Sequence, residues 1–158
     1  MTEVLGRPVT GEVSHYSSAP AEQWPDEQFL TYLDAVLDCE QVEAVRWHQY
    51  IPSFNDGDPC TFTLGEVYVK LVDGDEEAGE YEDGFIDGYN MYDGHWDESR
   101  RNYIRTPQPG FEVLYPALDK LGDAMGHFEL FLQTNFGDNA EITATKTGFE
   151  VGYYDCGY

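Results

Sequence analysis

The chain of 158 residues carries 31 acidic and only 8 basic side chains, which gives a formal net charge of −23. Such a field repels nucleic acid and anionic membranes and attracts cations or basic proteins, so direct binding of DNA or RNA is excluded from the expected functions. A composition that is 41% hydrophobic and 15% aromatic indicates a folded protein, because disordered acidic chains are poor in aromatic residues. We expect one domain, residues 1–158.

Targeting and cysteine signals indicate a cytoplasmic protein. No apolar run approaches the roughly 18 residues that a membrane-spanning helix needs. The first residues lack a basic segment followed by an apolar core, so no secretory signal is expected. Cys39, Cys60 and Cys156 are widely spaced and form no CxxC pair, which favours reduced, structural thiols. We therefore expect no membrane contact.

The first half of the chain predicts an arm, a helix and two strands. Residues 1–24 are predicted to form an extended or poorly ordered arm, with one short strand near residues 11–16. A helix is predicted over 25–39, where Phe29, Leu33 and Val36 begin a single apolar stripe. Alternating residues then predict a strand over 42–51, with Trp47 and Gln49 facing inward. A second strand is expected over 60–71, and its inward parity flips at Gly65, which predicts a β-bulge.

The second half predicts a longer helix and a hairpin. Six apolar residues recur at spacings of three and four from 111 to about 131 and predict one sustained helix: Leu114, Leu118, Leu121, Met125, Phe128 and Leu132. Gly137-Asp138-Asn139 is predicted to end it. Alternation over 141–146 and 149–153, across the turn at Thr147-Gly148, predicts the hairpin.

These elements form two α-β-β units, residues 25–72 and 111–158, separated by an insertion over 73–110. The simplest packing is an α+β fold in which four antiparallel strands form one sheet and both helices cover one face. Arg100, Arg101 and Arg105 follow the acidic part of the insertion. We expect them to pair with nearby carboxylates and to fold the insertion back on itself.

The stretch from Asp73 to Glu98 is the most unusual part of the chain. It contains 11 acidic residues and five aromatic residues in 26 positions, with no Lys or Arg. A segment that is only a solvated run of charges is not expected to contain five aromatic residues, and a buried element does not tolerate so many carboxylates. We expect a partner-binding surface made by Asp73, Asp75, Glu76, Glu77, Glu80, Glu82, Asp83, Asp87, Tyr89, Tyr92, Asp93 and Trp96. Whether its aromatic side chains face the core or a partner stays open.

Metal-binding and catalytic patterns are weak. An EF-hand reading that starts at Asp73 fails at its diagnostic positions, because Ala78 stands at position 6 and Gly84 at position 12. The chain contains no GxSxG, GxxxxGK[ST] or HExxH motif, and Cys60 with His48 lacks anything that would lower the pKa of the thiol. We predict no enzyme activity, no catalytic or metal-ligating residue and no cofactor.

The string WHQYIPSFNDGDPCTF, residues 47–62, is the most particular sequence in the chain. It resembles a WxQYxPxFNDGDPCxF pattern of uncharacterised small acidic proteins, many of them encoded by bacteriophages of actinobacteria. The resemblance covers residues 42–88 and implies a phage origin, but no particular activity. Phe54, Asn55, Asp56 and Asp58 make this loop a second candidate for partner binding. The alternative is structural, since Asn-Asp-Gly is turn chemistry and the aromatic residues can pack the hairpin.

The leading hypothesis is an acidic protein-binding module, encoded by a phage, that occupies a basic surface of a host protein. In its sharper form the carboxylates imitate the phosphates of a nucleic acid and inhibit a nucleic-acid-binding protein. Charge reversal at Glu76, Glu77, Glu82 and Asp83 is then expected to abolish binding. The alternatives are a structural virion or assembly protein, a divalent-cation-binding protein, and acidity that reflects a high-salt habitat. A homodimer stays open.

Overall fold

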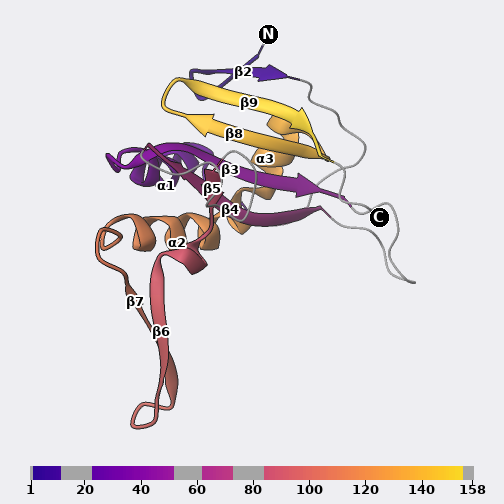
Figure 1. Cartoon of the computed structure of the whole chain (residues 1–158). Helices are drawn as coiled ribbons and strands as arrows, with labels where there is room; N and C mark the ends of the chain where they lie inside the picture. Colours follow the sequence, from indigo (N-terminus) through magenta and orange to yellow (C-terminus); the bar gives the residue numbers. More distant parts are fainter. Residues whose placement is uncertain (1, 12–22, 52–61, 73–83, 155–158) are drawn as a thin grey trace, which may run out of the picture.

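The computed structural model describes residues 2–11, 23–51, 62–72 and 84–154 (Figure 1). In chain order the elements are β1 (Thr2–Val4), β2 (Arg7–Gly11), α1 (Glu27–Leu37), β3 (Val42–Tyr50), β4 (Thr63–Leu71), β5 (Phe85–Ile86), η2 (Gly88–Asn90), β6 (Tyr92–Asp97), β7 (Asn102–Pro107), α2 (Leu114–Met125), η3 (Gly126–Phe128), α3 (Glu129–Phe136), β8 (Ala140–Thr145) and β9 (Gly148–Tyr153).

Among the described residues, the main sheet has seven strands in the order β1-β2-β9-β8-β3-β4-β5. It is mixed, because β2 runs parallel to β9 while the other neighbours are antiparallel. The α+β class is confirmed, but the predicted four-stranded antiparallel sheet is wrong. Its four strands are present at the centre as β9, β8, β3 and β4. Two strands from the N-terminal segment and one from the insertion extend this sheet at its two edges.

The N-terminal segment is part of the sheet, so the prediction of an arm is wrong for residues 2–11. Leu5 and Gly6 both have positive φ, 52° and 83°, which is the backbone of the tight turns that join hairpin strands. Val4 and Val9 enter the core at 3% and 4% exposure. Arg7 donates both to Oδ1 of Asp34 on α1, at 2.9 Å, and to its Oδ2, at 3.0 Å. The strand predicted at 11–16 lies almost entirely outside the described residues.

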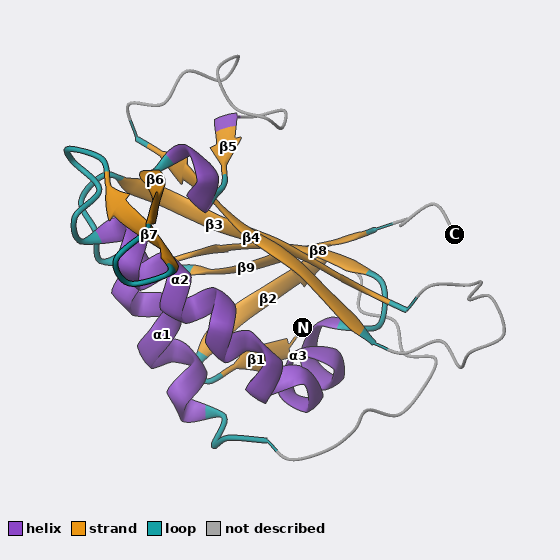
Figure 2. Ribbon diagram, turned by 90° about the horizontal axis from the view of Figure 1, so that it is seen from below, coloured by secondary structure: helices purple, strands orange, loops and turns teal. Residues whose placement is uncertain are grey.

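Three helices, α1, α2 and α3, pack on one face of the sheet (Figure 2). The apolar stripe of the second predicted helix is confirmed, because its six residues are all buried at 5% exposure or less. Trp47 and Gln49 face the same core and are fully buried, as the alternation of β3 predicts. This core places the polar face of α2 toward solvent and beside β4.

The second predicted helix is interrupted, and this departs from the single helix expected to residue 131. Phe128 leaves the helical region at φ −122° and ψ 17°, and the chain resumes as α3 and ends at Phe136. Trp24 lies against the interruption: its amide donates to the carbonyl of His127 at 2.9 Å, and its ring stacks on the His127 ring at 3.9 Å. Gly126, a poor helix former, stands at the same point of the chain. Gly137, at φ 97°, ends α3 as predicted.

The bulge predicted at Gly65 is confirmed. Trp47 pairs with Val67 and Gln49 pairs with Leu64, so Gly65 and Glu66 of β4 share the place opposite His48. The extra residue shifts the alternation by one position, so that the side chains of Val67 and Val69 point into the core, where they are 8% and 0% exposed. It also gives β4 a local irregularity beside the site described below.

Candidate partner-binding site

The insertion forms a hairpin that projects from the body of the molecule (Figure 1). Strands β6 and β7 pair from Tyr92 with Pro107 to Asp97 with Asn102, in a two-stranded sheet of their own. The base is held by Met91, which is fully buried and whose carbonyl accepts from the amide of Gln108 at 2.8 Å. The strands themselves are mostly exposed.

The tip of the hairpin is organised by Asp97. Its Oδ1 accepts from the amide of Ser99 at 3.0 Å, from the Ser99 hydroxyl at 2.7 Å and from the amide of Arg100 at 3.3 Å. The hydrogen bond from the Ser99 side chain is the main reason that the pKa of Asp97 lies below its ordinary value. Arg101 completes the turn at φ 51°. A defined turn keeps the two exposed strands in register.

The hairpin displays two large aromatic side chains. Trp96 and Tyr103 are cross-strand partners, 55% and 53% exposed. The Tyr103 ring crosses over Gly94, where a Cβ would collide with it. Exposed rings of this size on a projecting element are unusual on a surface that has no partner, since aromatic residues are enriched at protein interfaces.

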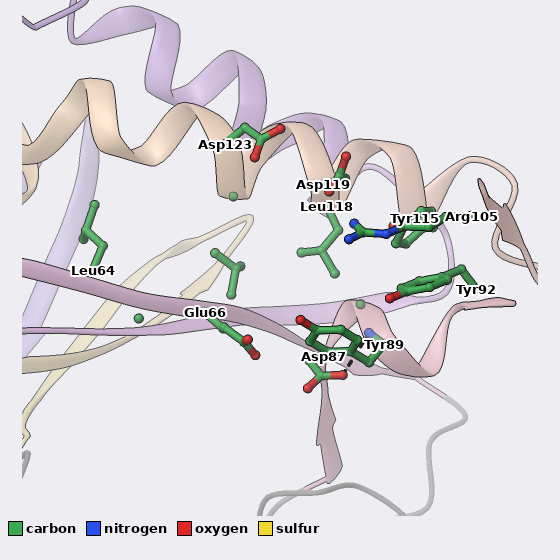
Figure 3. Close-up of a pocket in the computed structure, with 14 residues that line it drawn as sticks. Leu64, Glu66, Asp87, Tyr89, Tyr92, Arg105, Tyr115, Leu118, Asp119 and Asp123 are labelled. Atoms are coloured by element: carbon green, nitrogen blue, oxygen red, sulfur yellow. Dashed lines mark hydrogen bonds between the residues drawn. The ribbon is translucent and has the colours of Figure 1, made fainter. Parts of the chain in front are cut away.

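At the base of the hairpin a pocket of about 430 Å³ opens between β4, η2 and α2 (Figure 3). Its volume lies in the range of sites that bind small groups. It is lined by Leu64, Gly65, Glu66, Val67, Asp87, Gly88, Tyr89, Tyr92, Arg105, Tyr115, Leu118, Asp119, Gly122 and Asp123. Asp119 and Asp123 lie on the α2 side of the pocket, and Glu66 and Asp87 lie on the opposite side.

Three tyrosines form the aromatic end of the pocket. The rings of Tyr92 and Tyr115 are 5.0 Å apart, and those of Tyr89 and Tyr92 are 6.1 Å apart. Burial of the Tyr92 hydroxyl raises its pKa, against the lowering effect of nearby Arg105. Tyr89 is 66% exposed, so its ring faces solvent at the mouth. The arrangement offers ring faces, which attract cations.

One cation already lies on this aromatic wall. The Arg105 guanidinium carbon is 5.3 Å from the Tyr92 ring centre. A hydrogen bond to Tyr115 raises the pKa of Arg105, with the Tyr92 hydroxyl as the next cause. Four carboxylates and one guanidinium line the pocket, which leaves three negative charges in excess. The pocket therefore has the chemistry to bind a further positively charged group.

The expected role of the three arginines holds in part. Arg100 approaches Asp97 at 3.7 Å, and as an exposed pair this contributes little. Arg105 instead contacts tyrosines. The open question about the aromatic residues is answered in part: Phe85 is buried at 3% exposure beneath the Arg46 guanidinium on the other face of the sheet, whereas Tyr89 and Trp96 are exposed and therefore outside the core. Tyr81 lies outside the described residues.

The structure places five of the predicted partner-binding residues. Asp87, Tyr89 and Tyr92 come together at the pocket, Asp93 lies exposed on β6 within 3.3 Å of the Gln108 amide group, and Trp96 lies farther along the hairpin. Asp73, Asp75, Glu76, Glu77, Glu80, Glu82 and Asp83 lie outside the described residues. The loop candidates Phe54, Asn55, Asp56 and Asp58 also lie outside them. Partner binding by all of these residues stays a prediction.

Sequence reasoning missed the α2 wall. Asp119 and Asp123 stand four residues apart on one helix, and Gly122 lies beside them. Like charges at this spacing and a mid-helix glycine both weaken a helix. The occurrence of two like charges and a glycine on one face of a predicted helix was the feature of the sequence that could have indicated this wall.

Other kinds of site find little support in the described part of the chain. No group of three or more His, Cys, Asp or Glu side chains among those residues is arranged to hold a metal ion. Cys39 is a free thiol, and partial burial, reinforced by Asp38, raises its pKa. None of the helices in the described ranges has the length and apolar character needed to cross a bilayer. Comparison with protein-family models, curated proteins and solved structures finds no match.

Proposed function

We propose that this protein binds a basic surface of another protein through the pocket and the hairpin beside it. The observation that carries the proposal is the pocket itself, where three excess negative charges and three tyrosine rings line one cavity. Carboxylates attract a cationic partner over a distance, and aromatic rings supply the desolvated contacts that dominate binding energy. The net charge of −23 strengthens the first of these effects.

In the finer form of this proposal, the partner is a host protein that binds nucleic acid and the carboxylates stand in for phosphates. Duplex DNA presents about one charge per 1.7 Å, so a groove evolved to bind it attracts other dense arrays of negative charge. The resemblance of residues 47–62 to small phage proteins supports a phage-encoded inhibitor that acts in the host cytoplasm. The protein has no need of catalysis or a cofactor in this role.

The test begins with capture of a partner. Tagged protein is incubated with host-cell lysate at low salt and eluted with a salt gradient, and the dissociation constant of the identified partner is then measured against salt. Binding should weaken steeply, because the screening length shrinks from about 10 Å at 0.1 M to about 3 Å at 1 M salt. An affinity that does not change with salt would rule out the proposal.

A pair of charge-matched variants locates the contact. Asp119→Lys with Asp123→Lys reverses two exposed charges at the pocket. Glu3→Lys with Glu150→Lys makes the same change in net charge on β1 and β9, on the far side of β3 from β4. The first variant should weaken binding much more than the second. Competition by duplex DNA tests mimicry separately: if DNA does not displace the protein, the partner uses another basic surface.

A second candidate function is structural, as a virion or assembly protein. The projecting hairpin with exposed Trp96 and Tyr103 favours it, because such an element can insert into a neighbouring subunit. Sedimentation of the purified protein separates the two functions. A large symmetric oligomer supports assembly, and a monomer or dimer supports the binding module.

A further inference from the structure

The β4 wall of the pocket is the edge of a strand. The pocket touches four consecutive residues, Leu64 to Val67. The bulge at Gly65 and Glu66 interrupts the alternation of these residues, and their edge character follows from strand order, because β3 pairs with one side of β4 and the two-residue β5 lies on the other. On this side β5 pairs only with Val69 and Lys70. Within the described ranges, no strand pairs with residues 64–67 on the side away from β3.

The opposite wall is one face of a helix. Leu118, Asp119, Gly122 and Asp123 follow the spacing of adjacent turns of α2. Gly122 opens this wall, since a Cβ added there meets no atom within 4 Å. The pocket is therefore a groove between an edge strand and a helix (Figure 3). Grooves of this kind accept an extended peptide as an additional strand.

We propose that a short extended segment of a basic protein adds to the edge of β4 at Leu64–Val67 and places a cationic side chain beside Asp119 and Asp123. The choice of a basic partner rests on the proposed function above. Backbone hydrogen bonds to the strand supply affinity, and the groove selects the side chains that alternate toward it. The bulge at Gly65 and Glu66 twists the edge, which restricts the added strand to a few residues.

The charges at the groove select its occupant. Its lining carries three excess negative charges, and Arg105 shows that a guanidinium is accepted against the Tyr92 ring. A second copy of this chain is a poor occupant, because each copy carries a net charge of −23 and the two repel each other. A basic extended segment can pair with the edge of β4 that no described strand occupies and can also neutralise the carboxylates.

The test uses the full chain and a fluorescein-labelled peptide of alternating arginine and valine, followed by fluorescence anisotropy at low salt. A second peptide has the same sequence and charge, but its alternate amides are N-methylated and donate no hydrogen bond. We expect the methylated peptide to bind about tenfold more weakly or worse, because several backbone hydrogen bonds are lost. Equal affinity for the two peptides means attraction by charge alone and overturns strand addition.

Two glycine variants locate the peptide. Gly122→Leu fills the groove and should weaken binding about tenfold, a loss typical of a blocked contact. Gly126→Leu is the matched control, since Gly126 is also exposed, helical in φ and open around its Cβ, but lies outside the pocket lining. It should keep the dissociation constant within about twofold. Undiminished binding to Gly122→Leu overturns the location, and the comparison of the two peptides on the unaltered chain stands even if that variant does not fold.

The remaining outcomes separate this inference from the proposed function. A concentration-dependent dimer in sedimentation that Gly122→Leu abolishes shows that a second copy fills the groove, and overturns the choice of partner. If the peptides show no strand addition while the captured partner still binds in a salt-dependent way, only this inference fails. If no salt-dependent partner is captured, the proposed function fails with it.

Discussion

Replacement of Gln49 by Met tests whether the string at residues 47–62 has a structural role. Gln49 is fully buried, and its Nε2 donates to the carbonyls of Leu132 at 2.9 Å and Gly137 at 2.7 Å. Its Oε1 accepts from Trp47 Nε1 at 3.1 Å. Gly137 directly follows the last residue of α3, so its carbonyl has no partner within the helix, and this one amide ties the end of α3 to β3.

Met keeps the length of the side chain but leaves three buried polar groups without their Gln49 partner. Each such group costs about 1–3 kcal/mol, so we expect Gln49→Met to lower the free energy of unfolding by about 3–9 kcal/mol. That is a large part of the roughly 5–15 kcal/mol that stabilises a typical domain. Urea unfolding followed by circular dichroism measures the change by linear extrapolation.

Gln41→Met is the matched control, because Gln41 makes its hydrogen bond to the Gly110 carbonyl, at 2.7 Å, in an exposed position where water replaces it. We expect a loss below about 1 kcal/mol there. Equal and small losses for the two variants would refute the reasoning. A double-mutant cycle with Trp47→Phe then isolates the Trp47–Gln49 term, which should be non-additive because the two side chains share one hydrogen bond.

Three further outcomes are expected from local features. Gly122→Ala should stabilise the protein by about 0.5–1 kcal/mol in urea unfolding, because Ala is the better helix former and the site has room for a Cβ; a loss of stability would contradict this. The pKa of Asp97 is lowered, so its carboxylate adds stability that is present above its ordinary pKa near 3.8 and is lost as pH falls through the lower folded value; Ser99→Ala should raise that pKa in an NMR titration, and no change would remove the assigned cause. Trp96→Ala should change stability by less than about 1 kcal/mol and weaken binding to the captured partner by about tenfold or more; unchanged affinity would show that the hairpin is not an anchor.

The helices, the two long hairpins and the bulge followed from local patterns. Periodicity predicts these elements because each turns one apolar face toward the core, and the parity change around Gly65 left a trace in the residues themselves. Trp47 and Gln49 faced inward as expected, and their contacts favour the structural reading of this part of the string.

The edges of the sheet were not predictable in the same way. β2 pairs Val9 with Phe149, across almost the whole chain, and its RPVTG sequence lacks the alternation typical of a strand. β5 has only two residues. Pairing of such short segments is decided by the strand already in place beside them and by contacts such as that of Arg7 with Asp34. The four-stranded prediction therefore missed β1, β2 and β5, because these short strands carry no local pattern that predicts them.

Composition and local residue patterns are enough to establish the acidity of this protein, its α+β class and the presence of an aromatic, acidic insertion between two helix-hairpin units. The insertion contributes only part of the candidate site, through Asp87, Tyr89, Tyr92 and Arg105. Tertiary structure decided the rest, by placing the polar face of α2 opposite an edge of β4 that the two-residue β5 does not reach. No local pattern contains that juxtaposition, because it arises from where packing of the core leaves two distant segments side by side.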